Sequence, residues 1–222
     1  MNERIYVDTS GRTLQDYPRP SVAVDTAVLT IDPDLGLVVL EVRRPQPKVG
    51  WALPGAFVHE RERLAEAVNR SLRDNANVRG LNPRQLHVFD DPNRDERGWV
   101  LSVAHVDVVR PDQLESRFQD KTRLVPVSAP GRLPWGHGDI IGLAVDNIRS
   151  IYSDKPDPDR LLGEEFTLRE LRLTHEAVAG EPLQRDNFRR AMEPHLVATG
   201  TTVIAGRGRP AELFRRLGPS QR

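Results

Sequence analysis

The apolar and polar residues in the first half of this chain alternate with the two-residue period of β-strands. Residues 21–31 and 37–44 alternate in this way and are rich in valine, so we predict two strands joined by the turn DPDLG. A short strand at 51–55 leads into a helix over 62–75, since apolar residues recur there at helical spacing. The apolar face of this helix comprises Leu64, Ala65, Val68 and Leu72.

Three more strands and a second helix complete the predicted N-terminal domain. The strands lie at 85–89, 98–109 and 122–128, and the helix covers 138–152. The residues of this helix that we expect in a core are Ile140, Ile141, Leu143, Ile148 and Ile151. The pattern indicates a mixed α/β domain over residues 1–153, a normal size for one domain.

The pattern changes after 154–159, a proline-rich segment that we predict to be a linker separating two cores. Thr167 followed by Glu170 forms a capping box, and Gly180 is a natural helix end. The inward face of that helix comprises Leu168, Leu171, His175 and Val178. We expect His175 to be a hydrogen-bonded core histidine rather than a ligand.

A second short helix over 183–193 and two strands follow, which is the element order of a winged helix-turn-helix over residues 160–222. We expect Phe188, Ala191 and Met192 to point inward, with Arg185 and Arg189 one turn apart on the outer face.

Composition adds an asymmetry of charge. The formal net charge is zero, but residues 183–222 carry +5 and the first 182 residues carry −5, which suggests two separate tasks. The chain has no cysteine, no apolar run long enough to span a bilayer and no signal-peptide pattern at its start. We therefore expect a cytoplasmic protein, associated with the nucleoid when bound to DNA.

Residues 51–78 carry a degenerate phosphate-binding box. The Nudix pattern G-x5-E-x7-R-E-U-x-E-E-x-G-U, where U is an apolar residue, aligns with Ala56 in place of the first glycine, and Glu62 and Arg70 match its Glu and Arg. The metal-binding glutamates are replaced by Ser71, Asp74 and Asn75. Because Mg²⁺ requires several carboxylate oxygens, this frame predicts ligand binding without a metal site or hydrolysis.

The whole chain resembles the NrtR-type regulators, Nudix-related transcriptional regulators of NAD metabolism. The segments YPRPSVAVD, WALPGAFV, DDPNRDERGWVLSVAHV and FTLRELRLTHEAVAGEPLQRDNFRRAM carry this resemblance from Tyr17 to about Arg216. The resemblance implies an α/β mixed-sheet Nudix fold followed by a C-terminal winged helix-turn-helix domain. The expected function is repression of NAD biosynthesis or salvage genes, with ADP-ribose or NAD as effector and no cofactor.

The candidate DNA-binding residues lie on the second short helix and in the wing between the last two strands. They are Arg185, Asn187, Arg189, Arg190, Arg207 and Arg209. Arg207 and Arg209 could instead be unpartnered loop charges, and Asn187 could cap the helix or face inward. The expected partner is a palindromic double-stranded operator bound by a homodimer.

The candidate effector-binding residues flank the box on both sides. They are Arg43, Arg44, Trp51, Glu62, Arg70, Arg94 and Arg97. Trp51 could stack on a base or serve packing, Glu62 and Arg70 could form an ion pair, and Arg94 and Arg97 could meet phosphates or decorate a surface turn. The histidines, including His59 and His137, lack the spacing of zinc ligands.

Three other functions remain open from the sequence. An active Nudix hydrolase of ADP-ribose-like nucleotide diphosphates would release AMP with Mg²⁺ or Mn²⁺. A regulator of the same architecture could instead respond to sugars. An RNA-binding protein would use the basic tail on single strands, although the chain has no RNP-like aromatic motif.

Overall fold

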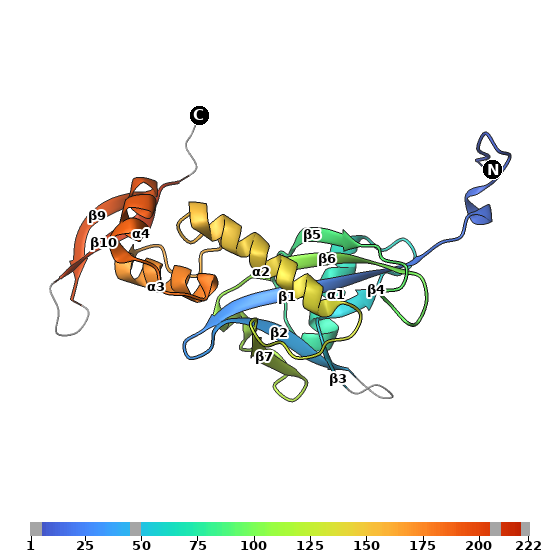
Figure 1. Ribbon diagram of the computed structural model, residues 1–222, viewed down its shortest axis with the longest axis horizontal. Helices are drawn as coiled ribbons and strands as arrows, with labels where there is room; N and C mark the ends of the chain where they lie inside the picture. Colours follow the sequence, from blue (N-terminus) through green and yellow to red (C-terminus); the bar gives the residue numbers. More distant parts are fainter. Residues whose placement is uncertain (1–5, 45–49, 205–209, 219–222) are drawn as a thin grey trace.

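The computed structural model describes residues 6–44, 50–204 and 210–218, and its larger part is built on a mixed β-sheet (Figure 1). The strands of this sheet are β1 (Ser21–Asp32), β2 (Gly36–Arg44), β3 (Gly50–Ala52), β4 (Gly55–Phe57), β5 (Arg84–Phe89), β6 (Val100–Val108) and β7 (Thr122–Pro126). The main order is β3-β2-β1-β6-β5, with β4 paired to β1 and β7 paired to β2. The β1–β6 pair is parallel and the other pairs are antiparallel.

Two helices cover the two faces of this sheet, α1 (Leu64–Ala76) and α2 (His137–Asp154). Because side chains alternate between the faces of a strand, Val24 and Val28 pack with α1 whereas Ala27 and Leu29 pack with α2. The same period places Asp25 on the α2 face. The structure confirms the buried positions of Ile140, Ile141 and Ile148 in α2. Leu143 is 38% exposed, so its predicted core position is wrong, and Ile151 is half-buried.

The end of α1 explains one departure from the box pattern. Asn77, which replaces the second box glycine, has φ 55° and ψ 36°, and its N–H donates to the carbonyls of Arg73 and Leu72. Asparagine is among the few residues that adopt this left-handed conformation readily. The substitution therefore preserves the helix end.

The C-terminal part contains two helices and a three-stranded sheet of order β8-β10-β9. Its elements are β8 (Phe166–Thr167), α3 (Leu168–Ala179), α4 (Arg185–Met192), β9 (Leu196–Val203) and β10 (Ala211–Arg216). Thr167 and Glu170 form the predicted capping box, and Gly180 ends α3 at φ 78°. Phe188 and Met192 are buried as predicted, in a cluster formed by α3 and the small sheet. Ala191 is exposed because the buried face of α4 is narrow and Ala191 lies at its edge.

The segment between α2 and β8 is folded around a buried carboxylate. Asp157 accepts hydrogen bonds from the N–H groups of Leu161 (2.8 Å) and Leu162 (2.9 Å) and pairs with Arg216 of β10. Val178 of α3 packs in the cluster formed by the central strands and α2. The C-terminal part has a hydrophobic cluster of its own, as expected for two cores, and it comprises Phe166, Leu171, Phe188, Met192, Leu196 and Phe214. Val178 nevertheless belongs to the N-terminal core, so the segment 154–159 does not keep the two cores apart.

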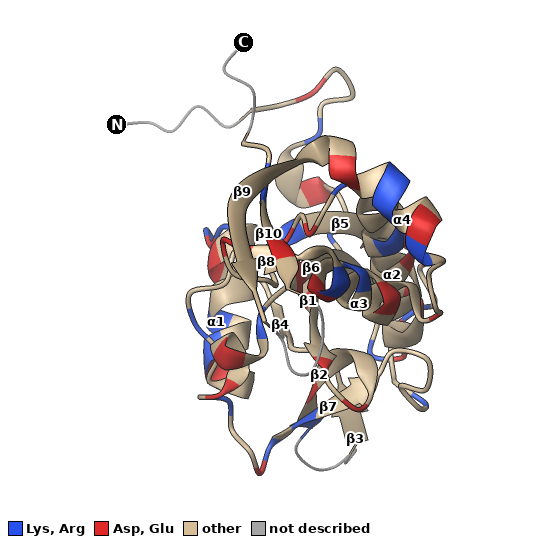
Figure 2. Ribbon diagram, turned by 90° about the vertical axis from the view of Figure 1, so that its left-hand side faces the viewer, with Lys and Arg blue, Asp and Glu red and all other residues tan. Residues whose placement is uncertain are grey.

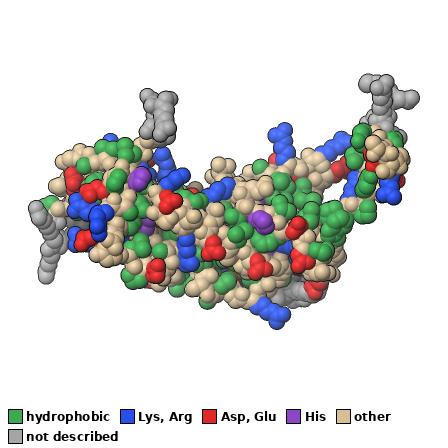
Figure 3. Space-filling view, turned by 45° about the horizontal axis from the view of Figure 1, so that its top comes forward, with side chains coloured by type: hydrophobic (Ala, Val, Ile, Leu, Met, Phe, Trp, Pro, Cys, Tyr) green, Lys and Arg blue, Asp and Glu red, His purple; other side chains and the backbone are tan. Residues whose placement is uncertain are grey.

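Three short 3-10 helices complete the described elements. They are η1 (Leu14–Asp16), η2 (Pro111–Leu114) and η3 (Glu193–His195). On the face of the molecule that Figure 3 shows, charges of both signs are interspersed. Residues 6–17 project from the end of β1, away from the C-terminal part (Figure 1). No helix within the described ranges has the length and apolar character needed to cross a membrane.

Candidate effector site and nucleic-acid interface

The Glu and Arg of the degenerate box bind each other. Arg70 donates from Nε to Glu62 Oε1 (2.7 Å) and from Nη2 to Glu62 Oε2 (2.8 Å), and Nη2 also reaches the Phe57 carbonyl (2.8 Å). These bonds from Arg70, together with the His59 N–H, lower the pKa of Glu62 to about 2. The pair holds the loop before α1 against β4, which confirms the ion pair considered from the sequence.

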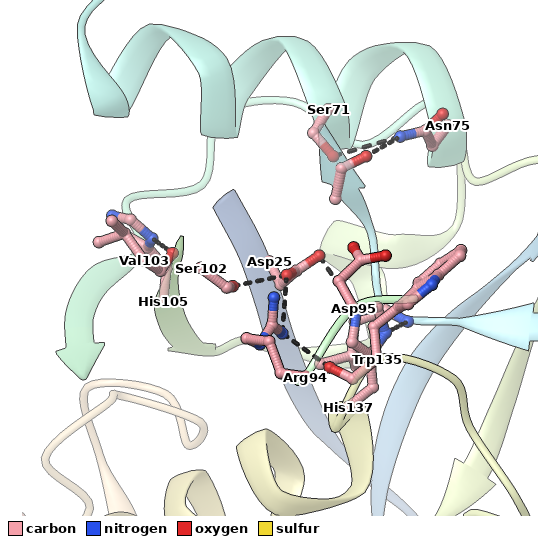
Figure 4. A network of polar contacts seen from close by, with 12 residues as sticks. Asp25, Ser71, Asn75, Arg94, Asp95, Ser102, Val103, His105, Trp135 and His137 are labelled. Carbon is pink, nitrogen blue, oxygen red and sulfur yellow. Dashed lines mark hydrogen bonds and ion pairs between the residues drawn. The ribbon is translucent and has the colours of Figure 1, made fainter. Parts of the chain in front are cut away.

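The positions of the missing glutamates are occupied by other polar contacts. Ser71 is buried, and Asn75 Nδ2 donates to Ser71 Oγ (3.2 Å) and to the Gly55 carbonyl (3.1 Å) (Figure 4). Asp74 points to solvent and pairs with Arg73 at 2.7 Å. Within the described residues, no group of three or more His, Asp and Glu side chains is arranged to hold a metal ion.

A hollow beside this helix, which we call the arginine hollow, collects side chains from five separate segments. It is lined by Ala23, Asp25, Arg44, Gly55, Ala56, Phe57, Arg94, Asp95, Arg97, Trp135 and His137. Its lining holds three arginines against two carboxylates, so its net charge is positive. A hollow of this charge is suited to an anion.

The floor of the arginine hollow is a buried carboxylate network (Figure 4). Asp25 accepts a hydrogen bond from Ser102 Oγ at 2.6 Å, and its other oxygen lies 3.3 Å from His137 Nε2. The Leu53 N–H donates to His137 Nδ1 at 2.9 Å, so Nδ1 is unprotonated and Nε2 carries the proton toward Asp25. A side chain at Gly55 would place its Cβ 2.0 Å from Asp25, so this position requires glycine.

Ionisation of Asp25 is maintained despite its burial. Burial alone raises the pKa of this carboxyl, but His137, Ser102 and Arg94 outweigh that effect and hold the pKa below its usual value. Asp25 is therefore a fixed negative charge beneath the arginines.

The three arginines differ in how they are held. Arg94 is nearly buried and donates to the Trp135 carbonyl at 2.7 Å, and Arg97 forms a bidentate pair with Asp95 at 2.9 and 2.6 Å. The Arg44 guanidinium lies 5.3 Å from the centre of the Trp135 ring, and its Nε is buried and has no hydrogen-bond partner among the residues that the structure describes. Arg44 is thus the arginine with an unused donor.

Trp135 adopts a conformation that is rare for a bulky residue. Its φ is 55°, in the left-handed region, and the Arg97 guanidinium lies 4.1 Å from its ring centre. Strain of this kind persists where the surrounding structure determines the conformation, and it is concentrated at functional sites.

A second, more open hollow adjoins the first and shares Arg94 and Trp135 with it. It is lined by Gly50, Trp51, Asn93, Arg94, Glu96, Arg132, Leu133, Pro134 and Trp135. Trp51 is half-buried, and the Arg123 guanidinium lies 4.4 Å from its ring centre. Arg123 is held in turn by buried Glu41, at 2.7 Å. The arginine hollow is thus cationic, and the adjoining hollow is flanked by Trp51 and Trp135.

The structure brings together Arg44, Arg94 and Arg97 of the predicted effector residues and places Trp51 in the adjoining hollow. The other three lie outside both linings: Glu62 and Arg70 bind each other, and Arg43 is exposed on the opposite face of β2.

Sequence reasoning missed Asp25, Trp135 and His137. A charged residue at an inward position of an otherwise apolar strand was the available signal for Asp25. His137 was tested only against zinc-ligand spacing, and nothing local in the sequence marks Trp135.

The exposed face of α4 carries the predicted DNA-binding residues that the structure describes, Arg185, Asn187, Arg189 and Arg190. Figure 2 shows basic and acidic positions side by side on this helix. Asn187 neither caps the helix with its side chain nor faces inward, because its Oδ1 accepts a hydrogen bond from Arg190 (2.5 Å). Arg189 pairs with Glu193 at 2.9 Å. Arg207 and Arg209 lie outside the described residues.

A third hollow between α3 and α4 adds two arginines that sequence reasoning missed. It is lined by Leu168, Arg169, Arg172, Arg185, Asp186, Phe188 and Arg189. Arg172 pairs with Glu176, which also accepts a hydrogen bond from the Leu183 N–H. The helix-turn-helix therefore presents arginines from both of its helices on one side.

Comparison with known proteins agrees with both parts of the structure. Residues 159–216 match the family described as the NrtR DNA-binding winged helix domain. The chain is 29% identical over 209 residues to the ADPR responsive transcriptional repressor NtrR of Acinetobacter baylyi, covering 90% of this chain and 83% of that protein. It is also 34% identical over 93 residues to the ADP-ribose pyrophosphatase of Methanocaldococcus jannaschii, covering 40% of this chain and 52% of that protein.

Solved structures extend the similarity over both domains. The crystal structure of Shewanella oneidensis NrtR complexed with a 27mer DNA matches with a TM-score of 0.72 and 30% identity, over 88% of this chain and 93% of that chain. The Nudix domain of the same protein, complexed with ADP ribose, matches with a TM-score of 0.53 and 25% identity, over 63% of this chain and 95% of that chain. With a mixed-sheet Nudix domain followed by a winged helix and this full-length similarity, the chain belongs to the NrtR family.

Proposed function

We propose that this chain is an ADP-ribose-responsive transcriptional repressor that binds its effector in the arginine hollow and DNA with its winged helix. The observation that supports the effector site is the buried Nε of Arg44 beside Trp135, for which the described part of the chain supplies no hydrogen-bond partner. A buried donor on a cation is unfavourable unless an acceptor meets it. The oxygens of a diphosphate are suitable acceptors, and guanidinium groups bind phosphate with directional hydrogen bonds.

The nucleotide class of the effector is supported by the shape of the site and by relatives. The adjoining hollow with Trp51 and Trp135 has the aromatic surfaces on which a base stacks. The Acinetobacter relative is named as ADPR responsive, and the Shewanella Nudix domain was crystallised with ADP ribose. We therefore favour ADP-ribose over NAD and over a sugar, and genes of NAD biosynthesis or salvage as the targets.

The second candidate function, hydrolysis of ADP-ribose, is favoured by the Methanocaldococcus pyrophosphatase alone among these relatives. We consider it the weaker proposal because Asn75 ties the box helix to Gly55 and Asp74 points to solvent. One carboxylate on that face is too few for a Mg²⁺ site that activates water. Release of AMP from ADP-ribose with Mg²⁺ or Mn²⁺ would favour the hydrolase.

The DNA partner is a palindromic duplex bound by a homodimer. A single winged helix makes few base contacts, whereas a two-fold pair doubles them across two half-sites. The arginines of α4 supply major-groove contacts, and those of α3 lie where the first helix of a helix-turn-helix crosses the phosphate backbone.

The effector site is tested by calorimetric titration of the full chain with ADP-ribose. We expect Arg44→Ala to raise the Kd about ten- to a hundredfold, because a hydrogen bond to a charged group contributes about 1.5–3 kcal/mol. Arg43→Ala is the matched control, since this neighbouring arginine is exposed on the other face of β2, and its Kd should equal that of the wild type. Equal effects of the two substitutions would place the ligand elsewhere.

A further inference from the structure

Helix α2 begins at the arginine hollow, since His137 lines it, and extends toward the C-terminal part (Figure 1). It begins at His137, whose ring lies on the floor of the hollow, and Trp135 precedes it by two residues. The helix has 18 residues and so is about 27 Å long at 1.5 Å per residue. One continuous helix therefore lines the arginine hollow at its start and contacts α3 of the DNA-binding domain through Arg149.

At its C-terminal end, α2 is joined to α4 through a stack of buried rings. The ring of Tyr152 lies 5.0 Å from the ring of His175 on α3, at an interplanar angle of 63°. The His175 ring lies 5.1 Å from the ring of Phe188 on α4, at 72°. Both are edge-to-face contacts between closely packed side chains. Phe188 lies one turn from Arg185 and directly precedes Arg189, so movement of this ring moves the arginine face.

A hydrogen bond and a ring contact fix the orientation of the middle ring. The Asp157 N–H donates to His175 Nε2 at 3.1 Å, and the ring of Tyr152 packs edge-to-face on the same imidazole. The imidazole thus contacts both α2 and the segment that follows it. The ring cannot shift independently of the end of α2 without breaking these contacts.

A second contact makes α3 follow α2. Arg149 of α2 donates from Nε to the Val178 carbonyl at 3.1 Å, and Val178 packs in the cluster that includes α2. By contrast, the direct pair between Arg84 of β5 and Asp159 has a distance of 3.5 Å, with 39% of the arginine side chain exposed. Because closely packed rings transmit displacement better than a long, hydrated ion pair, the ring stack is the stronger connection.

We propose that α2 couples the two binding sites, and that the Tyr152–His175–Phe188 stack is its contact with the DNA-binding helix. This inference rests on the proposed function, because it concerns how effector binding changes DNA binding. An effector that contacts Trp135 and His137 more favourably in one position of α2 selects that position. Because the ring stack joins α2 to α4, the position of α4 then changes with that of α2. By linkage, DNA binding then changes the affinity for effector by the same factor.

The test compares Tyr152→Leu, which removes the ring, with Tyr152→Phe, which keeps the ring and removes only the hydroxyl. The probes are ADP-ribose and a duplex that the wild-type protein selects from a random-sequence library. Three quantities are measured on the full chain: the Kd for ADP-ribose without DNA, the Kd for the duplex without ADP-ribose, and the factor by which saturating ADP-ribose changes the latter. The third quantity is the coupling factor.

We expect a coupling factor of about 5- to 150-fold in the wild type and in Tyr152→Phe, as is usual for allosteric proteins. In Tyr152→Leu it should fall below about twofold, while each separate Kd stays within about threefold of the wild type. The proposal is overturned if Tyr152→Leu retains the coupling factor of the wild type. It is also overturned if the wild type binds both probes but shows no coupling between them. A wild type that binds no ADP-ribose contradicts the proposed function itself, and the relay with it.

Hydrogen exchange of the α4 amides provides a second readout that requires no DNA. ADP-ribose should change this exchange in the wild type and in Tyr152→Phe, and should leave it unchanged in Tyr152→Leu while the α2 N-terminus still responds. If Tyr152→Leu does not fold, His175→Gln replaces it, because glutamine keeps an acceptor for the Asp157 N–H and removes the ring. An α4 response that persists in the ring-deleted variant contradicts the relay.

Discussion

At the scale of single residues, the arginine hollow combines the buried, ionised carboxylate of Asp25 with Arg44, whose Nε has no hydrogen-bond partner among the described residues. Burial lowers the pKa of Arg44 and the nearby Asp25 opposes that effect, yet an arginine remains protonated at neutral pH. Arg94 and Arg97 are each bonded to other groups, so Arg44 has the greatest need of a new acceptor. This difference makes Arg44 the residue whose loss should affect effector binding most.

His175 provides a prediction about acid stability. Burial, opposed by Asp157, lowers the pKa of His175 to about 4 from 6.5. Since the folded pKa is the lower one, the neutral form stabilises the protein above pH 6.5, and this stability is lost as the pH falls toward 4. Between pH 7 and pH 5 the loss from this residue should be roughly 2 kcal/mol.

Urea denaturation of the wild type and of His175→Gln at the two pH values measures this loss. The substitution should lower stability at pH 7 and reduce the further decrease at pH 5 by the same roughly 2 kcal/mol. The exposed His195 serves as the matched site, so His195→Gln should retain the wild-type decrease. An unchanged decrease in His175→Gln would mean that this histidine titrates normally in the folded protein.

Local rules predicted some of these residues and not others. The Glu62–Arg70 pair and the buried His175 follow from short spacings within one segment. The network of Asp25, Ser102 and His137 joins residues up to 112 positions apart, and only the pairing of β1 with β6 and the packing of α2 bring them together. A single sequence contains no local signal that residues so far apart lie next to each other in the fold.

At the scale of elements, periodicity located every long strand and helix to within a few residues. The errors concern faces: Leu143 and Ala191 have the spacing of core residues but are exposed. The spacing of apolar residues in the sequence locates the centre of the buried face of a helix. The width of that face depends on the element that packs against it. For α4 the partners are α3 and the small sheet, which bury only Phe188 and Met192 and leave the rest of the helix exposed.

Two arginines of α4 provide the prediction at this scale. Arg185→Ala combined with Arg189→Ala should weaken binding to the selected duplex by about 30-fold or more, because each base contact contributes about 1–3 kcal/mol. Fluorescence anisotropy at several salt concentrations measures the Kd and its salt dependence. Arg189 must leave or share its pair with Glu193, so we expect Glu193→Gln to strengthen binding slightly.

The matched control for charge is Arg110→Ala, since Arg110 is an exposed arginine of the N-terminal domain. It should leave the Kd unchanged. If the double substitution binds the duplex as the wild type does, then α4 is not the DNA-binding helix.

At the scale of the whole molecule, α3 links the hydrophobic cores of the two domains, because it contributes Val178 to one and Leu171 to the other. Val178 is fully buried among residues of the central sheet and α2, although it belongs to the helix-turn-helix. The three tryptophans, Trp51, Trp99 and Trp135, all lie in the N-terminal domain, so their fluorescence reports the unfolding of that domain alone. A substitution in α3 therefore tests whether the domains are independent.

Val178→Ala should lower the tryptophan-detected free energy of unfolding by about 2 kcal/mol, from the loss of two buried carbon atoms and the cavity that remains. Val197→Thr, a change of similar shape at an exposed position of β9, should not shift this transition. We further expect circular dichroism, which detects both domains, to give the same midpoint as the fluorescence, because α3 contributes Val178 to the N-terminal core and Leu171 to the C-terminal one and so links their unfolding. The contrary outcome is two separate transitions, of which Val178→Ala shifts only the one that tryptophan fluorescence does not detect. It would show that α3 belongs to the C-terminal core alone. Coupling through α2 would then have no mechanical basis.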